Sequence, residues 1–336
     1  MGERLMVFDS RGQISLQFNW IFVLIIGAVI LAFFLTVINN QEKRADAEEA
    51  TELVKTVDNV FTAIGTNPDT VETFTISQAD IRFDCEPGLS QYYIQGAGPV
   101  DTSHQAIFVP ATVEGKEVTM WTQTWHAPFP AMVVTHLASD RMTFLFVNDS
   151  MTTIEESLYR EMPDEFDKHL LTKAQLNGVS ETGYDRYVII TTDDSLNAPS
   201  DIEDEAHVRV IAPSNTGQYP TGNVTFKHGS NKKNKTYVTE PMLWGAIFTE
   251  DASTYDCTVA KARTRQRMLA TIIKDRLDTL MDELTHTTCG TYLSSANTPL
   301  EKLAGDDALE DVTDEMEEVE SANDLIKRGP RCPLIY

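Results

Sequence analysis

An uninterrupted apolar run near the N-terminus constrains this chain more than any other feature of its sequence. Residues 20–38 read WIFVLIIGAVILAFFLTVI, nineteen residues without a charge. A helix rises ~1.5 Å per residue, so this run would extend over about 28 Å, close to the ~30 Å hydrocarbon core of a bilayer. The run therefore predicts a helix that crosses a membrane once.

The alternative for this run is a removable signal peptide. The apolar region of such a peptide is shorter, roughly 7–15 residues, and a cleavage site of small residues follows it. Here Asn39, Asn40 and Gln41 follow the run and offer no such site. A retained anchor is the stronger interpretation, with Trp20 at one membrane interface and the asparagines at the other.

Small residues lie close together within the predicted span. Ala28 and Ala32 are four positions apart, and Gly27 is next to them. This spacing lets the backbones of two membrane helices approach each other closely. We therefore expect the bilayer as one partner, and a second copy of the chain or another envelope protein as a possible partner through this face.

The residues just before the apolar run form a short motif. Residues 11–17 read RGQISLQ. This order resembles the class III signal peptides of archaeal type IV pilin-like proteins over about residues 9–40. The resemblance implies that a prepilin-type peptidase cuts between Gly12 and Gln13 and leaves the apolar helix on the mature protein. Gln17 stands where the family usually carries Glu, a difference that bears on filament assembly more than on membrane insertion.

The helical pattern continues beyond the apolar run. Residues 42–64 contain neither Pro nor Gly, and apolar side chains recur there every three or four positions. Gly65 and Pro68 then end the predicted helix. We therefore divide the N-terminal part into a cytoplasmic leader-like segment (1–12), a transmembrane helix (13–38) and a stalk helix (39–66).

The rest of the chain predicts a mixed β and α/β ectodomain, so the fold class is α+β. Short alternating segments, separated by Pro and Gly, indicate a β-rich region over 67–140. In the region 141–254, strands at MTFLFVND and DRYVIITTDD enclose a helical segment and predict a βαβ unit with a small parallel sheet. Within that region we expect a helix to start at MPDEF and a strand at WGAIFTED.

The C-terminal region, 255–336, is expected to be helical. Apolar residues recur at helical spacing over 254–286, which predicts a long helix. The acidic segment 305–324 shows the same spacing, so we expect a packed helix there as well. The opposite face of the longer helix is basic, and its cations are Lys261, Arg263, Arg265, Arg267, Lys274 and Arg276. These could bind an anionic partner or lipid headgroups, but ion pairs with the acidic segment are the simpler interpretation.

The charge balance of the whole chain is strongly acidic. Asp and Glu number 51 against 27 Lys and Arg, a formal net charge of −24. A nucleic-acid-binding face needs clustered cations, so we do not expect nucleic acid as a partner. The acidity fits adaptation to high salt, in which ions screen self-repulsion. It also fits a hard cation held by oxygen ligands, and the candidates are Asp149, Asp193, Asp194, Asp201, Glu203, Asp204 and Glu205. Solvated acidic loops are the simpler interpretation, and no metal site is assigned.

Two tryptophans share one face of a predicted strand. Trp121 and Trp125 are four residues apart in MWTQTWH. Together they could form a stacking platform for a ligand such as a carbohydrate. Burial in the core is the interpretation we favour.

Four cysteines and three glycosylation sequons favour an extracellular location for the C-terminal domain. The cysteines are Cys85, Cys257, Cys289 and Cys332, with no CxxC pair, and the sequon asparagines are Asn148, Asn223 and Asn234. An even number of cysteines suits two disulfides outside the cell. Cys257 and Cys289 flank the predicted long helix and are a plausible pair, which would leave Cys85 with Cys332, although three pairings are open.

Motifs of familiar enzymes are missing from this sequence. It contains no G-x-S-x-G, P-loop, G-x-G-x-x-G or H-E-x-x-H motif. We therefore expect no enzyme, no catalytic residue and no cofactor. The predicted function is that of a single-pass membrane protein of the cell surface, with a cytoplasmic N-terminus and a structural, adhesive or pilin-like role. The alternative is a ligand-binding or sensor ectodomain on the same anchor, and an unrecognised surface enzyme ranks third.

Overall fold

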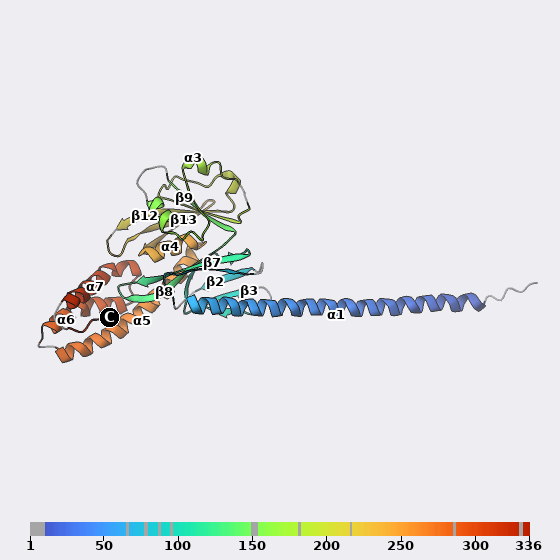
Figure 1. Ribbon diagram of the computed structural model, residues 1–336, viewed down its shortest axis with the longest axis horizontal. Helices are drawn as coiled ribbons and strands as arrows, with labels where there is room; N and C mark the ends of the chain where they lie inside the picture. The colour runs from blue at the N-terminus through green and yellow to red at the C-terminus, as the bar shows by residue number, and fades with distance from the viewer. Residues whose placement is uncertain are drawn as a thin grey trace, which may run out of the picture. The chain divides into compact units, whose positions relative to one another are not determined.

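The computed structural model of this protein describes most of the chain. The described residues are 11–64, 67–76, 80–86, 89–94, 97–148, 154–180, 183–215, 217–284, 287–328 and 332–336. The chain divides into two units, residues 1–53 and residues 54–336. A mixed α+β fold is confirmed, with an apolar helix at the N-terminus and long helices near the C-terminus (Figure 1).

The first unit contains most of α1 (Arg11–Ile64), a single continuous helix. Its segment Trp20–Asn39 is long and apolar enough to cross a membrane, and none of it is buried within the protein. The expected helix over the apolar run is confirmed, and so is its continuation to residue 64.

The second unit contains three sheets, as far as its described residues extend. The first has the order β1-β7-β8-β5, the second β4-β3-β2-β6, and the third β10-β9-β11-β12-β13-β14. The strands of the first sheet are β1 (Val71–Thr75), β5 (Ala106–Phe108), β7 (Glu117–His126) and β8 (Pro130–Ser139). Those of the second are β2 (Ile81–Glu86), β3 (Leu89–Ile94), β4 (Val100–Asp101) and β6 (Thr112–Val113).

The third sheet contains the expected parallel strands. Its strands are β9 (Met142–Val147), β10 (Lys168–Leu171), β11 (Arg186–Thr191), β12 (Ala206–Asn215), β13 (Thr221–His228) and β14 (Asn231–Val238). β9 runs parallel to β10 and β11, and β11 parallel to β12, while β13 and β14 complete the sheet in antiparallel fashion. All six residues of β9 are buried, as expected for a parallel strand covered on both faces.

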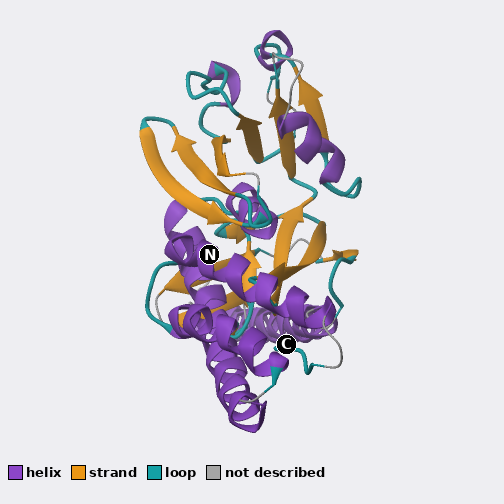
Figure 2. Ribbon diagram, turned by 90° about the vertical axis from the view of Figure 1, so that its left-hand side faces the viewer, coloured by secondary structure: helices purple, strands orange, loops and turns teal. Residues whose placement is uncertain are grey.

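Helices complete the second unit. They are α2 (Ile154–Glu161), α3 (Lys173–Leu176), α4 (Glu240–Phe248), α5 (Ala252–Leu284), α6 (Thr288–Ala304) and α7 (Thr313–Arg328), with short 3₁₀ turns at Ser200–Ile202 and Leu309–Val312. Helix α6 packs against both α5 and α7, and these three helices lie together in orange to red in Figure 1. Figure 2 shows the helices in purple against the sheets.

Helix α4 corrects the strand expected at WGAIFTED. Every residue from Met242 to Phe248 is buried, so the segment is apolar on all sides and has no helical periodicity to read. Trp244 lies 5.2 Å from Trp121 of β7, and Phe248 lies 4.9 Å from Phe144 of β9, measured between ring centroids. The helix therefore joins the first sheet to the third through the main core.

The prediction that a helix starts at MPDEF, residues 162–166, is also wrong. Residues 162–167 form a turn that leads into β10. Lys168 explains why α2 stops, because its Nζ donates to the carbonyl oxygens of Tyr159, at 3.1 Å, and of Met162. These bonds satisfy carbonyls at the C-terminal end of α2, and Pro163 cannot continue the helix.

Candidate functional site

The two disulfides of the chain join Cys85 to Cys257 and Cys289 to Cys332. All four cysteines pair, but the pairing that we favoured from the sequence is wrong. Cys257 lies near the start of α5 and Cys289 follows its end, about 40 Å away at ~1.5 Å per residue. Bridged residues need Cα atoms within about 7 Å, so the rigid helix keeps these two cysteines apart.

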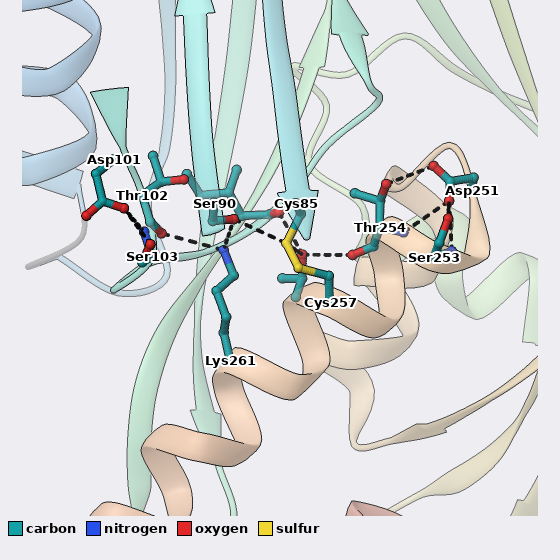
Figure 3. Close-up of a disulfide and its surroundings, with 12 residues drawn as sticks. Cys85, Ser90, Asp101, Thr102, Ser103, Asp251, Ser253, Thr254, Cys257 and Lys261 are labelled. Carbon is teal, nitrogen blue, oxygen red and sulfur yellow. Dashed lines mark hydrogen bonds between the residues drawn. A yellow bond between two sulfur atoms is a disulfide. The ribbon is translucent and has the colours of Figure 1, made fainter. Parts of the chain in front are cut away.

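The Cys85–Cys257 disulfide ties strand β2 to helix α5, with 5.9 Å between the Cα atoms. The pairing of two strands and the spacing of residues on α5 each place a polar side chain beside this disulfide. In the antiparallel pairing of β2 with β3, Ser90 is the partner of Cys85. On α5, Lys261 follows Cys257 by four residues and so lies on the same helix face. Figure 3 shows all four side chains converging.

Consecutive hydrogen bonds connect Lys261, Ser90 and Cys85. Lys261 Nζ donates to Ser90 Oγ at 2.8 Å and to the carbonyl oxygen of Thr102 at 3.5 Å. Ser90 Oγ in turn donates to Cys85 Sγ at 3.2 Å (Figure 3). The Ser90 side chain is buried, so its hydroxyl is fixed between the ammonium group and the sulfur. We call Cys85, Ser90, Cys257 and Lys261 the disulfide cluster.

Burial weakens the proton affinity of the lysine in this cluster. It lowers the pKa of Lys261 to about 8, and the nearby Asp101 carboxylate partly opposes that shift. The Asp101 carboxylate accepts hydrogen bonds from the side chain and backbone of Ser103, which lower its pKa. Lys261 therefore carries its positive charge at neutral pH and loses it in mildly alkaline solution.

Two cavities flank Lys261. One, of about 980 Å³, is lined by both cysteines of the disulfide together with Ser90 and Lys261. The other, of about 660 Å³, has an apolar floor that includes Phe61 and Met132. Its other lining groups include the titratable side chains His104, Lys261 and Arg265.

In some enzymes a lysine of lowered pKa lies beside a serine and activates it as a nucleophile by accepting its proton. In such a pair the serine proton must pass to the amine. Here the Ser90 hydroxyl donates to Cys85 Sγ and accepts from Lys261. The serine proton therefore points toward the sulfur and away from the amine, so Lys261 does not activate Ser90 in this arrangement.

Two of the predicted cation ligands, Asp193 and Asp194, lie beside lysines. Asp193 forms an ion pair with Lys173 at 2.6 Å, and Asp194 pairs with Lys227 at 2.8 Å and with Lys232 at 3.4 Å. Asp149 lies outside the described residues. Over the described part of the chain, no group of three or more His, Cys, Asp or Glu side chains is placed to hold a metal ion.

The stacking platform proposed for Trp121 and Trp125 does not exist, and the favoured prediction, burial of both rings in the core, is confirmed. Trp121 is packed against Trp244, Phe248 and His136. Trp125 is fully buried, and its indole nitrogen donates to Thr239 Oγ1 at 3.1 Å. Neither ring is available to stack on a ligand.

Part of the basic face of α5 is paired within the chain, and some of its partners lie in the acidic segment 305–324. Arg267 pairs with Asp306, and Arg263 donates to the carbonyl oxygens of Leu303 and Asp307. Lys274 instead pairs with Asp278 on its own helix. The acidic segment is helical over α7, as expected, but α7 packs on α6.

Two of the predicted sequons face each other across the β13–β14 hairpin. Thr236 Oγ1 donates to Asn223 Oδ1 at 3.4 Å, and Thr225 Oγ1 donates to Asn234 Oδ1 at 3.5 Å. Each asparagine is therefore hydrogen-bonded to the threonine of the other sequon. Asn148 directly follows β9, and Ser150 of its sequon lies outside the described residues. Glycosylation at these sites stays a prediction.

The residues predicted to act near the N-terminus all lie on α1. Gly12 and Gln13 belong to its first turn. Ala28 and Ala32 are exposed, and a Cβ atom added at Gly27 would meet no atom within 4 Å. The small-residue face therefore contacts nothing within the described chain that would fill it.

No protein-family model, curated protein or solved structure matches this chain. Function therefore has to be inferred from its own residues. Sequence reasoning identified the four cysteines and the lysine of the disulfide cluster but missed Ser90. The signal for Ser90 is the short LSQYYI segment after Cys85, which forms a hairpin with the strand that carries the cysteine.

Proposed function

We propose that this protein is a single-pass, membrane-anchored protein of the cell surface. The exposed apolar segment Trp20–Asn39 of α1 is the observation that carries this proposal. Its large apolar side chains other than Val37 are 42–69% exposed, although burying apolar surface is worth ~25 cal/mol per Å². Hydrocarbon is a solvent in which such a helix is stable, because all its backbone groups are paired internally.

The location of the domain outside the cell rests on its disulfides. Both cysteine pairs are oxidised and the chain has no free cysteine. Disulfides persist in oxidising surroundings and are rare in the cytosol. With residues 20–39 in the bilayer, residues 54–336 would lie outside and the N-terminus inside. The segment between them would form a stalk.

The role we favour for the anchored domain is structural, as an adhesive or pilin-like component of the envelope. The RGQISLQ motif supports processing at Gly12, and the open face at Gly27, Ala28 and Ala32 supports contact with a second membrane helix. A ligand-binding ectodomain is the second candidate. It is favoured by the cavity of about 660 Å³ with an apolar floor and the cationic groups Lys261 and Arg265.

Protease treatment of intact cells tests the location. If the domain lies outside, an added protease removes residues 54–336 from intact cells and leaves a short membrane-bound peptide. A cytoplasmic domain would survive until the cells are lysed, and that result would contradict the proposal. Mass spectrometry of the mature N-terminus tests the processing step separately. We expect Gln13 as the first residue, and a mature chain that begins at Met1 would refute cleavage.

Substitutions in the span separate the structural role from the sensor role. Ala28→Leu and Ala32→Leu enlarge the small-residue face without adding charge, so the chain should still enter the membrane. If the face packs against another chain, chemical crosslinking should detect fewer oligomers for both variants. Val29→Leu is the matched control, since it changes a neighbouring exposed position. Unchanged crosslinking would favour a monomeric binding module.

A further inference from the structure

We propose that the Cys85–Cys257 disulfide is a site of thiol–disulfide exchange with a small, uncharged dithiol, and that Ser90 and Lys261 stabilise the Cys85 thiolate released by the exchange. This inference goes beyond the anchoring role and does not depend on it. It concerns the chemistry of the disulfide cluster alone.

The hydrogen bond from Ser90 selects Cys85 as the leaving sulfur. The Ser90 hydroxyl already donates to Cys85 Sγ at 3.2 Å in the oxidised protein. Thiolate sulfur is a stronger acceptor than disulfide sulfur because it carries the full negative charge, so this bond strengthens as the S–S bond breaks. No hydroxyl donates to Cys257 Sγ over the described residues, so the two sulfurs are not equivalent.

The positive charge of Lys261 acts through the same hydroxyl. Its ammonium group donates to Ser90 Oγ at 2.8 Å, which polarises the hydroxyl toward the sulfur. A nearby cation lowers the pKa of a cysteine, and a leaving thiol of lower pKa departs faster. Asp101 is the acidic group that acts on Lys261 and helps to keep it charged, and the pKa of Lys261 near 8 leaves it protonated at neutral pH.

An external thiol has access to the disulfide. Both cysteines are half-buried, and both line the cavity of about 980 Å³. Glu86 and Asp256 also line this cavity, and Asp256 forms an ion pair with Lys235. The net charge of −24 on the whole chain repels anionic thiols, which is why the proposed reductant is uncharged.

The exchange balances as a two-electron transfer. One thiolate of the dithiol attacks Cys257 Sγ, the S–S bond breaks, and its electron pair leaves on Cys85 as a thiolate. The second thiolate of the dithiol then attacks the first sulfur of the same dithiol, which is bonded to Cys257 Sγ in the mixed disulfide, and that bond breaks. The dithiol closes to its own disulfide and releases Cys257 as a thiolate. The two protons of the dithiol end on the two cysteines, and β2 is no longer tied to α5.

The second disulfide of the chain is an internal control. Cys289–Cys332 closes a shorter segment, with a sequence separation of 43 against 172. Its cysteines are also half-buried, but no side chain in the described part of the chain donates a hydrogen bond to either sulfur. Because both disulfides are half-buried, a difference in their reduction rates that is lost in the Ser90 and Lys261 variants reports the effect of these two side chains.

The test is timed reduction of the full-length protein in native membranes at pH 7 with dithiothreitol, an uncharged dithiol. Free thiols are trapped with iodoacetamide, and each cysteine is quantified by mass spectrometry. We expect Cys85 and Cys257 to be reduced about tenfold faster than Cys289 and Cys332. We expect Lys261→Met and Ser90→Ala each to slow that reduction by about fivefold, because each removes stabilisation of the leaving thiolate.

Control variants keep the result independent of folding. Lys274→Met removes a lysine of the same helix that pairs with Asp278, and it should leave both reduction rates unchanged. Lys261→Arg keeps the positive charge and should retain most of the rate if Lys261→Met proves unstable. The ratio of the wild-type rate to the Lys261→Met rate should fall as the pH rises through 8. Equal rates for the two disulfides, or a Lys261→Met rate equal to wild type in a folded protein, would overturn the proposal.

Discussion

Helices α1 and α5 are both long, but they place their apolar side chains in opposite surroundings. In α1, Trp20 and Leu24 are each 69% exposed, within a stretch that carries no charge. In α5, Ala262, Ala270 and Leu277 are at most 1% exposed, and they lie on one side of a helix rich in charged residues. A helix with one apolar face needs one apolar neighbour, whereas a helix that is apolar all round needs apolar surroundings. The rest of the chain provides the apolar neighbour for α5, and we propose that lipid provides the apolar surroundings for α1.

The largest expected effect comes from charging the exposed helix. The double variant Ile26→Arg/Ile30→Arg places two arginines near the middle of the apolar segment, at a cost of about 5–7 kcal/mol on insertion scales. We expect the protein to move from the membrane pellet to the soluble fraction after extraction with alkaline carbonate. The matched variant Ile26→Val/Ile30→Val should stay in the pellet. A double-arginine variant that remains fully in the pellet would show that another part of the chain holds it there.

A smaller effect is expected when the packed helix is changed. Leu277→Ala removes a buried side chain of α5 and should lower the free energy of unfolding of the domain by about 2–5 kcal/mol. Ile272→Ala changes an apolar residue of the same helix that is 62% exposed, and should change that free energy by at most about 0.5 kcal/mol. Chemical denaturation followed by circular dichroism measures both. Equal losses for the two variants would mean that α5 does not have the buried face described above.

Acid should destabilise the folded domain gradually and leave the membrane attachment of the apolar segment of α1 unchanged. His136 is fully buried against Phe108 and Phe248, and burial lowers its pKa to about 3. The unfolded chain takes up this proton near pH 6.5, so stability is lost as the pH falls from 6.5 toward 3. His207, whose pKa is also lowered to about 3 chiefly by burial, adds to the same loss. The apolar segment has no titratable group, so acid should not release the protein from the membrane.

The variant His136→Gln measures how much of the stability lost at acid pH is due to His136 alone. The variant removes a titrating group and keeps a side-chain donor for Gln123 Oε1, which lies 3.0 Å from His136 Nε2. Below pH 6.5 we expect its stability to fall less steeply than that of the wild type, by up to about 1.4 kcal/mol per pH unit. Denaturation midpoints at several pH values give the slope. Parallel slopes for the two proteins would contradict the buried, neutral state of His136.

Local periodicity explains which parts of the fold could be predicted from the sequence. The apolar run, the short alternating strands, the βαβ unit and α7 all carry patterns that span a few residues. Helix α4 could not be predicted, because its surroundings bury every side and erase the pattern. Strand β10 could not either, since the bonds from Lys168 to the end of α2 depend on contacts that form only in the folded chain.

The candidate site was predictable only in part for a similar reason. The spacing of Cys257 and Lys261 on one helix face is local, and the sequence gives it directly. The partner of Cys257 is not local, because 172 positions separate it from Cys85. Ser90 reaches the sulfur through the register of β2 against β3, and that register depends on the folded sheet.

The most direct test of the central claim compares matched positions on the two helices. Leu31 of α1 and Ile272 of α5 are 64% and 62% exposed. A nitroxide label is introduced at each position in turn in the membrane-embedded protein, and its collisions with oxygen and with a water-soluble nickel chelate are measured. We predict that the label at residue 31 collides with oxygen and not with the chelate, and that the label at residue 272 collides readily with the chelate. Equal access of the chelate to both labels would contradict the proposal that α1 lies in lipid.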